Sequence, residues 1–383
     1  MRIGFDASNI GGGGGVTHLK EILAHLPLQK GIEKVVVFAS QKVLKQLPED
    51  NVIQKITFSA FNKGLFHRVW FQVWNYDKHI KQHCDILFSI TGDYLGNFKP
   101  VVGMSRNMLL YERDIWKEIK EPKEILRFWL NYQKQKRCFK NASGIIFISQ
   151  YAKDYVSKKL NLRIKQIAVI HHGISPRFQE EVGKQFPIKN YSVENPFKLL
   201  YVSTVHVYKH QWNLVEVVTV LRKKGYPVEL DLVGGVIFKP AGKKLDKVIE
   251  ETDPQHKFIH YHGHVPYDKI DEFYKKTDGI VYASTCENMP NILIESMASG
   301  LPIVCSNKQP MPEFLKENGF YFDAKNVDSI SNAIEEMFLN PEKRESMAKR
   351  NFEEVKKYSW EITANETFSF LEEIYTSYYG NRQ

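Results

Sequence analysis

The sequence predicts an α/β fold built from two parallel-sheet domains. Short runs of β-branched and apolar residues alternate with helical patterns along all 383 residues, which is typical of parallel strands joined by crossover helices. The length favours two domains over one, because a single hydrophobic core rarely grows that large. A polar, proline-containing stretch at 175–196 interrupts the alternation, so we expect two successive Rossmann-like units with a linker between them.

The first unit begins with a strand at 2–7, a run of glycines and a helix over about 16–26. Its further strands are expected at 35–39, 53–58, 86–90, 101–104, 144–148 and 167–170. In the second unit, strands are expected at 198–203, 228–233, 258–261, 279–283, 302–305 and 320–322. Apolar residues at helical spacing predict closing helices at 327–339, 341–357 and 360–379.

The composition is typical of a soluble globular protein, with 43% hydrophobic and 25% charged residues. No apolar run reaches the ~18 residues that suggest a membrane-spanning helix, and the start turns polar too soon for a signal peptide. The cysteines have no paired spacing, so we expect reduced thiols rather than a disulfide framework or a zinc site; they are Cys84, Cys138, Cys286 and Cys305. These features favour a cytoplasmic location.

Charge is distributed unevenly along the chain. Residues 1–180 hold 28 Lys and Arg against 15 Asp and Glu, whereas residues 181–383 hold 25 against 29. The basic first half therefore favours an anionic partner, such as nucleic acid, a membrane surface or a lipid diphosphate. Two stretches, 66–81 and 117–140, mix aromatic and basic residues; such segments either lie on a membrane or form core helices with a solvated side. No nucleic-acid recognition signature is present, so we expect no nucleic acid partner.

Two carboxylates are expected at one strand end in the second half. The strand at 279–283 is followed by a loop that contains Glu287 and then by a helix that contains Glu295, which Gly300 and Pro302 end. Both carboxylates can therefore border one pocket at the carboxyl end of a parallel strand, where open α/β sheets bind ligands.

The same stretch can also bind an anion. The amides of the first helical turn, around 288–292, offer an anion site. Carboxylates accept hydrogen bonds from sugar hydroxyls, while amides and cations hold a diphosphate. Together these groups favour a sugar-nucleotide site, although the Glu-x7-Glu spacing alone also fits two solvated side chains on an ordinary turn.

The Glu-x7-Glu spacing, its helix and the Gly-x-Pro strand entry resemble the donor-site motif of glycosyltransferase family 4. The resemblance extends over nearly the whole chain and implies a GT-B fold, in which two Rossmann-like domains face a central cleft. It implies an acceptor domain at 1–180, a nucleotide-sugar donor domain at 181–358, and a last helix at 359–383 that crosses back to the first domain. By resemblance, Glu287 contacts the transferred sugar and Glu295 the nucleotide ribose.

The loop after the first strand of the second unit resembles the part of this family that holds the donor diphosphate. The resemblance gives that role to Lys209. Ser203 and Thr204 stand where many members have Gly and then Arg, so one of the two usual cations is absent. Lys209 then acts alone or is assisted by His206.

The glycine run lies at a strand-to-helix turn, where a backbone without Cβ atoms can approach a phosphate. The second strand ends in Ala39 and Ser40 rather than in an acidic residue, which counts against a dinucleotide. A flexible turn without a ligand is the alternative. The resemblance implies a loop near the donor phosphates and assigns donor contacts there to Gly13, Gly14 and Gly15.

Further contacts are implied by the resemblance alone. Those on the donor side are Ser203 and Thr204 after the first strand of the second unit, Gly235, His264 and Val265, beside the nucleobase, and Asn288, Met289, Pro290 and Asn291 in the Glu-x7-Glu loop. On the acceptor side, Arg106 and Asn107 stand where members often carry a His; Asn107 can bind sugar hydroxyls and Arg106 can offset phosphate charge. His262 and His264 lack a third ligand at suitable spacing, so we expect no metal and no other cofactor.

The resemblance implies a retaining, metal-independent hexosyltransferase in which Glu287, Lys209 and Asn107 act in catalysis. The donor is a nucleotide-diphosphate sugar of mannose or rhamnose type. The acceptor is a growing surface glycan, as in lipopolysaccharide O-antigen biosynthesis, or a polyprenyl-diphosphate-linked sugar. Such an enzyme works in the cytoplasm or peripherally on the inner face of the cytoplasmic membrane. A nucleotide-sugar epimerase and a non-catalytic nucleotide-sugar binding protein are the alternatives.

Overall fold

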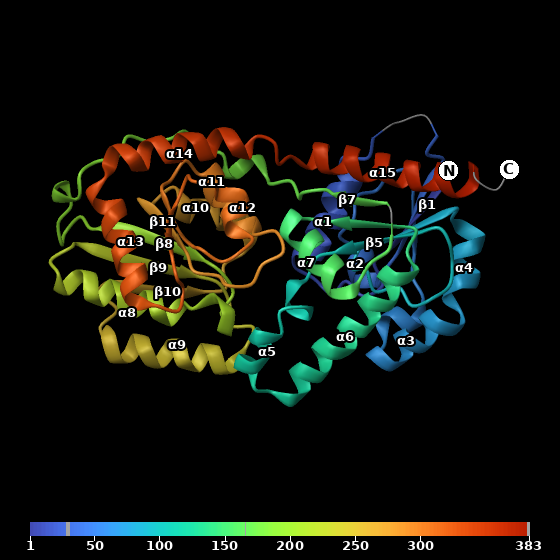
Figure 1. Ribbon diagram of the computed structural model, residues 1–383, viewed down its shortest axis with the longest axis horizontal. Helices are drawn as coiled ribbons and strands as arrows, with labels where there is room; N and C mark the ends of the chain where they lie inside the picture. Colours follow the sequence, from blue (N-terminus) through green and yellow to red (C-terminus); the bar gives the residue numbers. More distant parts are fainter. Residues whose placement is uncertain (28–30, 165, 381–383) are drawn as a thin grey trace. The chain divides into compact units, whose positions relative to one another are not determined.

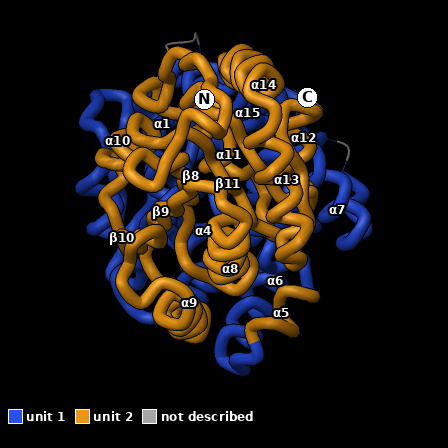
Figure 2. The backbone as a smooth tube through the Cα atoms, turned by 90° about the vertical axis from the view of Figure 1, so that its left-hand side faces the viewer, with its two compact units in different colours: residues 1–113, 120–173, 358–383 blue, residues 114–119, 174–357 orange. Residues whose placement is uncertain are grey.

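A computed structural model describes residues 1–27, 31–164 and 166–380 (Figure 1). The chain divides into two compact units, coloured separately in Figure 2. Unit 1 comprises residues 1–113, 120–173 and 358–383, and unit 2 comprises residues 114–119 and 174–357. We expected boundaries after residues 180 and 358; the units divide after residues 173 and 357 and also place a short internal segment, 114–119, in unit 2.

Unit 1 contains a seven-stranded parallel sheet in the order β3-β2-β1-β4-β5-β6-β7. Strand order reverses at β1, so the loops after β1 and β4 leave the sheet on either side of a topological switch point. The expected strands are confirmed to within one or two residues. They are β1 Arg2–Asp6, β2 Lys34–Phe38, β3 Ile53–Ile56, β4 Ile86–Ser89, β5 Val101–Ser105, β6 Gly144–Phe147 and β7 Ile167–Val169.

The helices of unit 1 bury apolar stripes at helical spacing. In α1, for example, the buried face includes Val16, Leu19, Ile22 and Leu23. The last helix, α15, packs on α1 and β4 and so belongs to the core of unit 1. The α-helices are α1 Gly14–Ala24, α2 Gln41–Leu44, α3 Leu65–Trp74, α4 Tyr76–His83, α5 Arg113–Ile119, whose last six residues belong to unit 2, α6 Pro122–Asn141, α7 Gln150–Leu160 and α15 Trp360–Gly380.

Unit 2 contains a six-stranded parallel sheet in the order β10-β9-β8-β11-β12-β13. Its switch point lies between β8 and β11, as expected for a doubly wound sheet. The strands are β8 Phe197–Val202, β9 Val228–Val233, β10 Ile259–Gly263, β11 Gly279–Tyr282, β12 Ile303–Ser306 and β13 Phe320–Phe322. The α-helices are α8 Gln211–Lys223, α9 Lys239–Thr252, α10 Asp271–Tyr274, α11 Asn291–Ala298, α12 Met311–Leu315, α13 Val327–Leu339 and α14 Pro341–Val355.

The helix predicted after the Glu-x7-Glu loop is α11. Its apolar face, which includes Leu293, Ile294 and Met297, is buried. Gly300 adopts a left-handed conformation with φ 67° just after the helix, a conformation that glycine adopts without steric cost. The predicted end of this helix is therefore confirmed.

All four cysteines are buried free thiols, as expected. Burial raises the pKa of Cys84 to about 12, so this thiol is uncharged at neutral pH. Within the described part of the chain, no helix is long and apolar enough to span a membrane.

The start of α15 packs closely against Gly173 in unit 1. A Cβ atom added at Gly173 would lie 2.2 Å from the backbone N of Trp360 and 2.5 Å from the carbonyl carbon of Ser359. Real Cβ atoms do not approach backbone atoms this closely, so the last helix can start here only because residue 173 has no side chain.

We therefore expect Gly173→Ala to lower the free energy of unfolding by about 1–3 kcal/mol, the typical cost of overpacking. Denaturant unfolding followed by circular dichroism measures the change. Gly183→Ala is the matched control, because a Cβ there meets nothing within 4 Å. Equal unfolding midpoints for the two variants would contradict this account of the packing.

Candidate active site

Two loops of unit 2 are joined at the carboxyl ends of β8 and β11. The backbone N of Thr285 donates a hydrogen bond to the carbonyl of Tyr208 at 2.9 Å, and the Thr285 hydroxyl lies 3.0 Å from Nε2 of His210. His210 adopts a left-handed conformation with φ 51°, and Tyr201 donates to the carbonyl of Lys209 at 3.0 Å. These contacts fix the loop that carries Lys209 against the loop that carries Glu287.

The buried Lys209 and the half-buried Glu287 form an ion pair. The Lys209 ammonium contacts Oε1 of Glu287, and the two side chains are only 9% and 17% exposed. The same carboxylate oxygen accepts hydrogen bonds from the Tyr282 hydroxyl at 2.8 Å and the Ser284 hydroxyl at 2.6 Å. The structure thus brings together two of the predicted residues. Because an ammonium carries three N–H donors, Lys209 can contact an anionic ligand while it keeps Glu287 as a partner.

Glu295 lies in α11 and is 3% exposed, so it is not the solvated side chain that the spacing alone also allowed. Its Oε1 accepts a hydrogen bond from the Tyr267 hydroxyl at 2.7 Å, whereas its Oε2 is buried without a hydrogen-bond partner in the described residues. Burial raises the pKa of Glu295 to about 7. A buried acceptor without a donor costs free energy, and a hydroxyl of a bound ligand would remove that cost.

Sequence reasoning missed Arg177 and Tyr267, which support Glu295. The Arg177 guanidinium stacks over the Tyr267 ring with 4.1 Å between Cζ and the ring centroid. Its positive charge acts to lower the pKa of Glu295, against the larger effect of burial. Arg177 lies in the segment that we expected to be only a linker, and its polar composition gave no sign of this contact.

The other expected donor residues of unit 2 lie at adjacent strand ends. The backbone N of Ser203 donates to Val233 at 2.8 Å, beside Gly235. A Cβ added at Gly235 would lie 3.3 Å from the Cβ of His264. Ser203, Gly235 and His264 therefore follow the neighbouring strands β8, β9 and β10 at one edge of the sheet. Thr204 and His264 are exposed there, and Val265 is half-buried.

The loop before α11 is largely inaccessible. Asn288, Met289 and Pro290 are buried and Asn291 is half-buried. Pro290 is the N-cap residue of α11 and supplies no side-chain cap, so first-turn amides depend on another acceptor. The anion site expected at this helix start stays a prediction.

His206 is less suited to assist Lys209 than the sequence suggested. Its Nδ1 accepts a hydrogen bond from the backbone N of Val207 at 2.9 Å. Its ring stacks on Phe238 with 5.0 Å between centroids. The imidazole is therefore used in part to fix its own loop.

In unit 1, the glycine loop contacts the loop that follows β5. Arg106 donates a hydrogen bond from Nη2 to the carbonyl of Gly14 at 2.6 Å, and burial lowers the pKa of Arg106 to about 10. A Cβ at Gly15 would lie 3.3 Å from Nη1 of Arg106. Gly13 has φ 60°, and nothing lies within 4 Å of a Cβ built there. Only the last two glycines of the run are thus packed closely.

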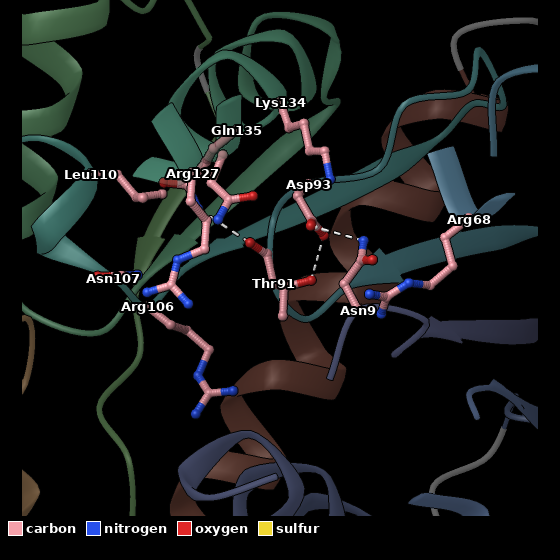
Figure 3. A pocket seen from close by; sticks show the side chains of 11 residues that line it. Asn9, Arg68, Thr91, Asp93, Arg106, Asn107, Leu110, Arg127, Lys134 and Gln135 are labelled. Carbon is pink, nitrogen blue, oxygen red and sulfur yellow. Dashed lines mark hydrogen bonds between the residues drawn. The ribbon is translucent and has the colours of Figure 1, made fainter. Parts of the chain in front are cut away.

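Arg106 and Asn107 both line a cavity of about 450 Å³ in unit 1 (Figure 3). The side-chain oxygen of Asn107 accepts a hydrogen bond from the backbone N of Leu109 at 3.0 Å and so caps the short turn that follows β5. The two residues expected on the acceptor side therefore lie together. Their cavity belongs to unit 1 alone.

Two family models match the chain. Residues 12–178 match the model described as Glycosyltransferase Family 4, and residues 184–354 match Glycosyl transferases group 1. The chain is similar to the O-antigen chain mannosyltransferase B of Escherichia coli, with 31% identity over 112 residues, or 29% of either chain. It is also similar to the amylovoran biosynthesis glycosyltransferase AmsD of Erwinia amylovora, with 22% identity over 226 residues.

The second alignment covers 59% of this chain and 61% of that relative, so both alignments span less than two thirds of the relatives. Among solved structures, Anabaena HepE in complex with UDP-glucose has a TM-score of 0.71 at 17% identity. That match covers 98% of this chain and 100% of the other, and at this identity it shows the fold. Each half of the chain thus matches a glycosyltransferase family model, and the fold is that of GT-B glycosyltransferases.

Proposed function

We propose that this protein is a glycosyltransferase that binds a nucleotide-diphosphate sugar at the strand ends of unit 2. The observation that carries the proposal is the Lys209–Glu287 ion pair at the switch point of the sheet. Glu295 adds a buried carboxylate oxygen that no described residue satisfies. The UDP-glucose complex of HepE, a protein of the same fold, supports a donor of this chemical class.

Each side chain has a role that its chemistry supports. Glu287 orients hydroxyls of the transferred sugar, Glu295 accepts hydrogen bonds from the ribose, and Lys209 stabilises the diphosphate. The remaining contacts to the donor are made by Ser203, Thr204, Gly235, His264 and Val265. Asn107 and Arg106, in unit 1, contact the acceptor.

We propose transfer with retention of the anomeric configuration and without a divalent metal. The bond between the sugar C1 and the departing phosphate oxygen breaks, and the acceptor oxygen bonds to C1 on the same face. The acceptor hydroxyl gives its proton to the departing phosphate. Lys209 and the first-turn amides of α11 stabilise the negative charge that develops on the diphosphate.

The proposed donor sugar is a hexose of mannose or rhamnose type, and the proposed acceptor is a surface glycan or its lipid-linked precursor. The Escherichia coli relative is named an O-antigen mannosyltransferase and the Erwinia relative an amylovoran biosynthesis glycosyltransferase, which supports this direction. Exposed aromatic side chains on α3 and α6 support peripheral contact with a membrane.

Nucleotide binding tests the donor site first. We expect UDP, GDP or dTDP, or one of their sugars, to raise the melting temperature selectively without added metal. A ligand at about 100 times its Kd stabilises by about 2.7 kcal/mol. Glu295→Gln should lose most of this response. A response that requires a divalent metal would contradict the metal-free proposal, and no response to any nucleotide would contradict the donor site. Donor conversion without an acceptor would indicate an epimerase.

The Lys209–Glu287 pair is tested by a double-mutant cycle. Glu287→Ala should abolish transfer and also lower stability by about 3 kcal/mol, because it leaves the buried ammonium without its partner. Combination with Lys209→Met should restore much of that stability, since the unpaired charge is gone, but no activity. Denaturant unfolding and product formation from the donor identified above measure the two effects. Additive losses of stability would show that the pair is not coupled.

The raised pKa of Glu295 leads to a prediction of how nucleotide affinity depends on pH. Burial raises its pKa from 4.5 to about 7, so its contribution to stability is present below pH 4.5 and is lost as the pH rises through about 7. Ribose hydroxyls that donate to the carboxylate favour its ionised form. Nucleotide affinity should therefore rise by up to about tenfold between pH 6 and 8, as measured by calorimetry. Glu295→Gln should show a flat profile; the same rise in that variant would exclude Glu295 as its cause.

A further inference from the structure

Unit 1 contains a basic cavity that the donor chemistry does not use (Figure 3). It lies at the carboxyl ends of β1, β4 and β5, and residues of helices α3 and α6 also line it. Arg68 enters it from α3, Arg127 and Lys134 from α6, and Arg106 from the loop after β5, while Asp93 follows β4. Its volume of about 450 Å³ is within the range of small-molecule sites.

The cavity has more positive charge than its own carboxylate can balance. Asp93 is the one acidic residue among the lining residues, against four cationic ones. Its two oxygens already accept hydrogen bonds from Asn9 at 2.8 Å and Thr91 at 2.5 Å. The second carboxylate nearby, Glu124, pairs with Arg127 on the exposed face of α6. Such exposed pairs are weak.

Two of the cations have buried donors without an acceptor. The Nε atoms of Arg68 and Arg106 are buried and donate to no group in the described residues. A buried donor left unpaired costs free energy. Burial and the nearby charge of Arg68 lower the pKa of Lys134, and the charge of Asp93 offsets this only in part. Lys134 therefore also lies where negative charge is insufficient. An anion in the cavity would supply the missing acceptor and separate these like charges.

Exposed apolar side chains also occur on the two helices that supply cavity residues. On α3, the exposed fractions are 78% for Phe66, 54% for Trp70 and 73% for Trp74. On α6, the exposed apolar residues are Leu126, Trp129 and Leu130.

Helical spacing places this apolar strip of α6 beside the cavity. Leu126 and Leu130 lie one helical turn apart, and the cavity residues Arg127 and Asn131 follow each of them by one position. The apolar strip of α6 is therefore adjacent to the strip that lines the cavity. Large exposed apolar surfaces of this kind mark contacts with a partner or a membrane, and basic residues beside them favour anionic lipid.

We propose that this cavity binds the phosphate or diphosphate of a lipid-linked acceptor, while the exposed apolar strip of α6 contacts the lipid. Arginine guanidinium groups suit phosphate oxygens because they donate paired hydrogen bonds. The role of this ligand as the acceptor rests on the proposed glycosyltransferase function, whereas the binding of a lipid phosphate in the cavity does not.

The test is calorimetry on the full chain with farnesyl diphosphate, farnesol and inorganic pyrophosphate. We expect farnesyl diphosphate to bind at least tenfold more tightly than either other probe. The double variant Arg68→Gln with Lys134→Gln should weaken farnesyl diphosphate binding at least tenfold. Lys136→Gln with Arg137→Gln is the matched control, because it also removes two positive charges, from α6 outside the cavity, and should bind as the native chain does. Leu126→Ala with Leu130→Ala should weaken binding of farnesyl diphosphate but not binding of pyrophosphate.

Several outcomes would overturn the proposal. Native-like binding by the Arg68, Lys134 variant would remove the cavity from the interaction. Loss of binding in Lys209→Met instead would place the diphosphate in unit 2. Equal binding of pyrophosphate and farnesyl diphosphate would indicate a free phosphate rather than a lipid, and equal binding of farnesol would exclude recognition of the anion.

The two proposals can fail separately. In the Arg68, Lys134 variant, an unchanged thermal response to nucleotide shows that the fold and the donor site are intact. Glu295→Gln provides the reverse case, because this variant should lose the thermal response to nucleotide and still bind farnesyl diphosphate. If the protein binds farnesyl diphosphate but shows no thermal response to any nucleotide, only the donor-site proposal fails.

Discussion

The contact between Lys209 and Glu287 is the interaction on which the candidate donor site depends. Parallel strands on either side of a switch point send their following loops in different directions, so the loops after β8 and β11 need a specific contact to form one site. The ion pair provides it, together with the hydrogen bond between Thr285 and Tyr208. The Tyr282 and Ser284 hydroxyls donate to the same carboxylate oxygen that Lys209 contacts and so help to hold it in place.

The candidate sites of the two units differ in charge. At the strand ends of unit 2, Glu287 and Glu295 lie with the cations Lys209 and Arg177, which suits a ligand that has many hydroxyls and one diphosphate. In unit 1, arginines and a lysine exceed the one carboxylate among the cavity residues, which suits an anionic ligand. The excess of basic residues in the first half of the sequence thus has a local structural counterpart in this cavity.

Much of the fold follows from patterns that are local in sequence. Strands such as β4, Ile86–Ser89, and β11, Gly279–Tyr282, are buried throughout, so continuous apolar runs reveal them without knowledge of their neighbours. Glu287 and Glu295 could be predicted for the same reason, because a loop and the helix after it stay close together. Lys209 is 78 residues from Glu287, and only the family resemblance connected the two.

The sequence by itself determined the alternation of strands and helices, the place of the carboxylates at a strand end, and the unequal charge of the two halves. These properties depend on residue type and on spacing within one or two elements. Only the tertiary structure decided that Arg177 and Tyr267 support Glu295, and that Arg68 on α3 and Lys134 on α6 line one cavity. The physical reason is that crossover topology brings together segments that are distant along the chain, and no local pattern specifies which basic residues from different helices will line one cavity.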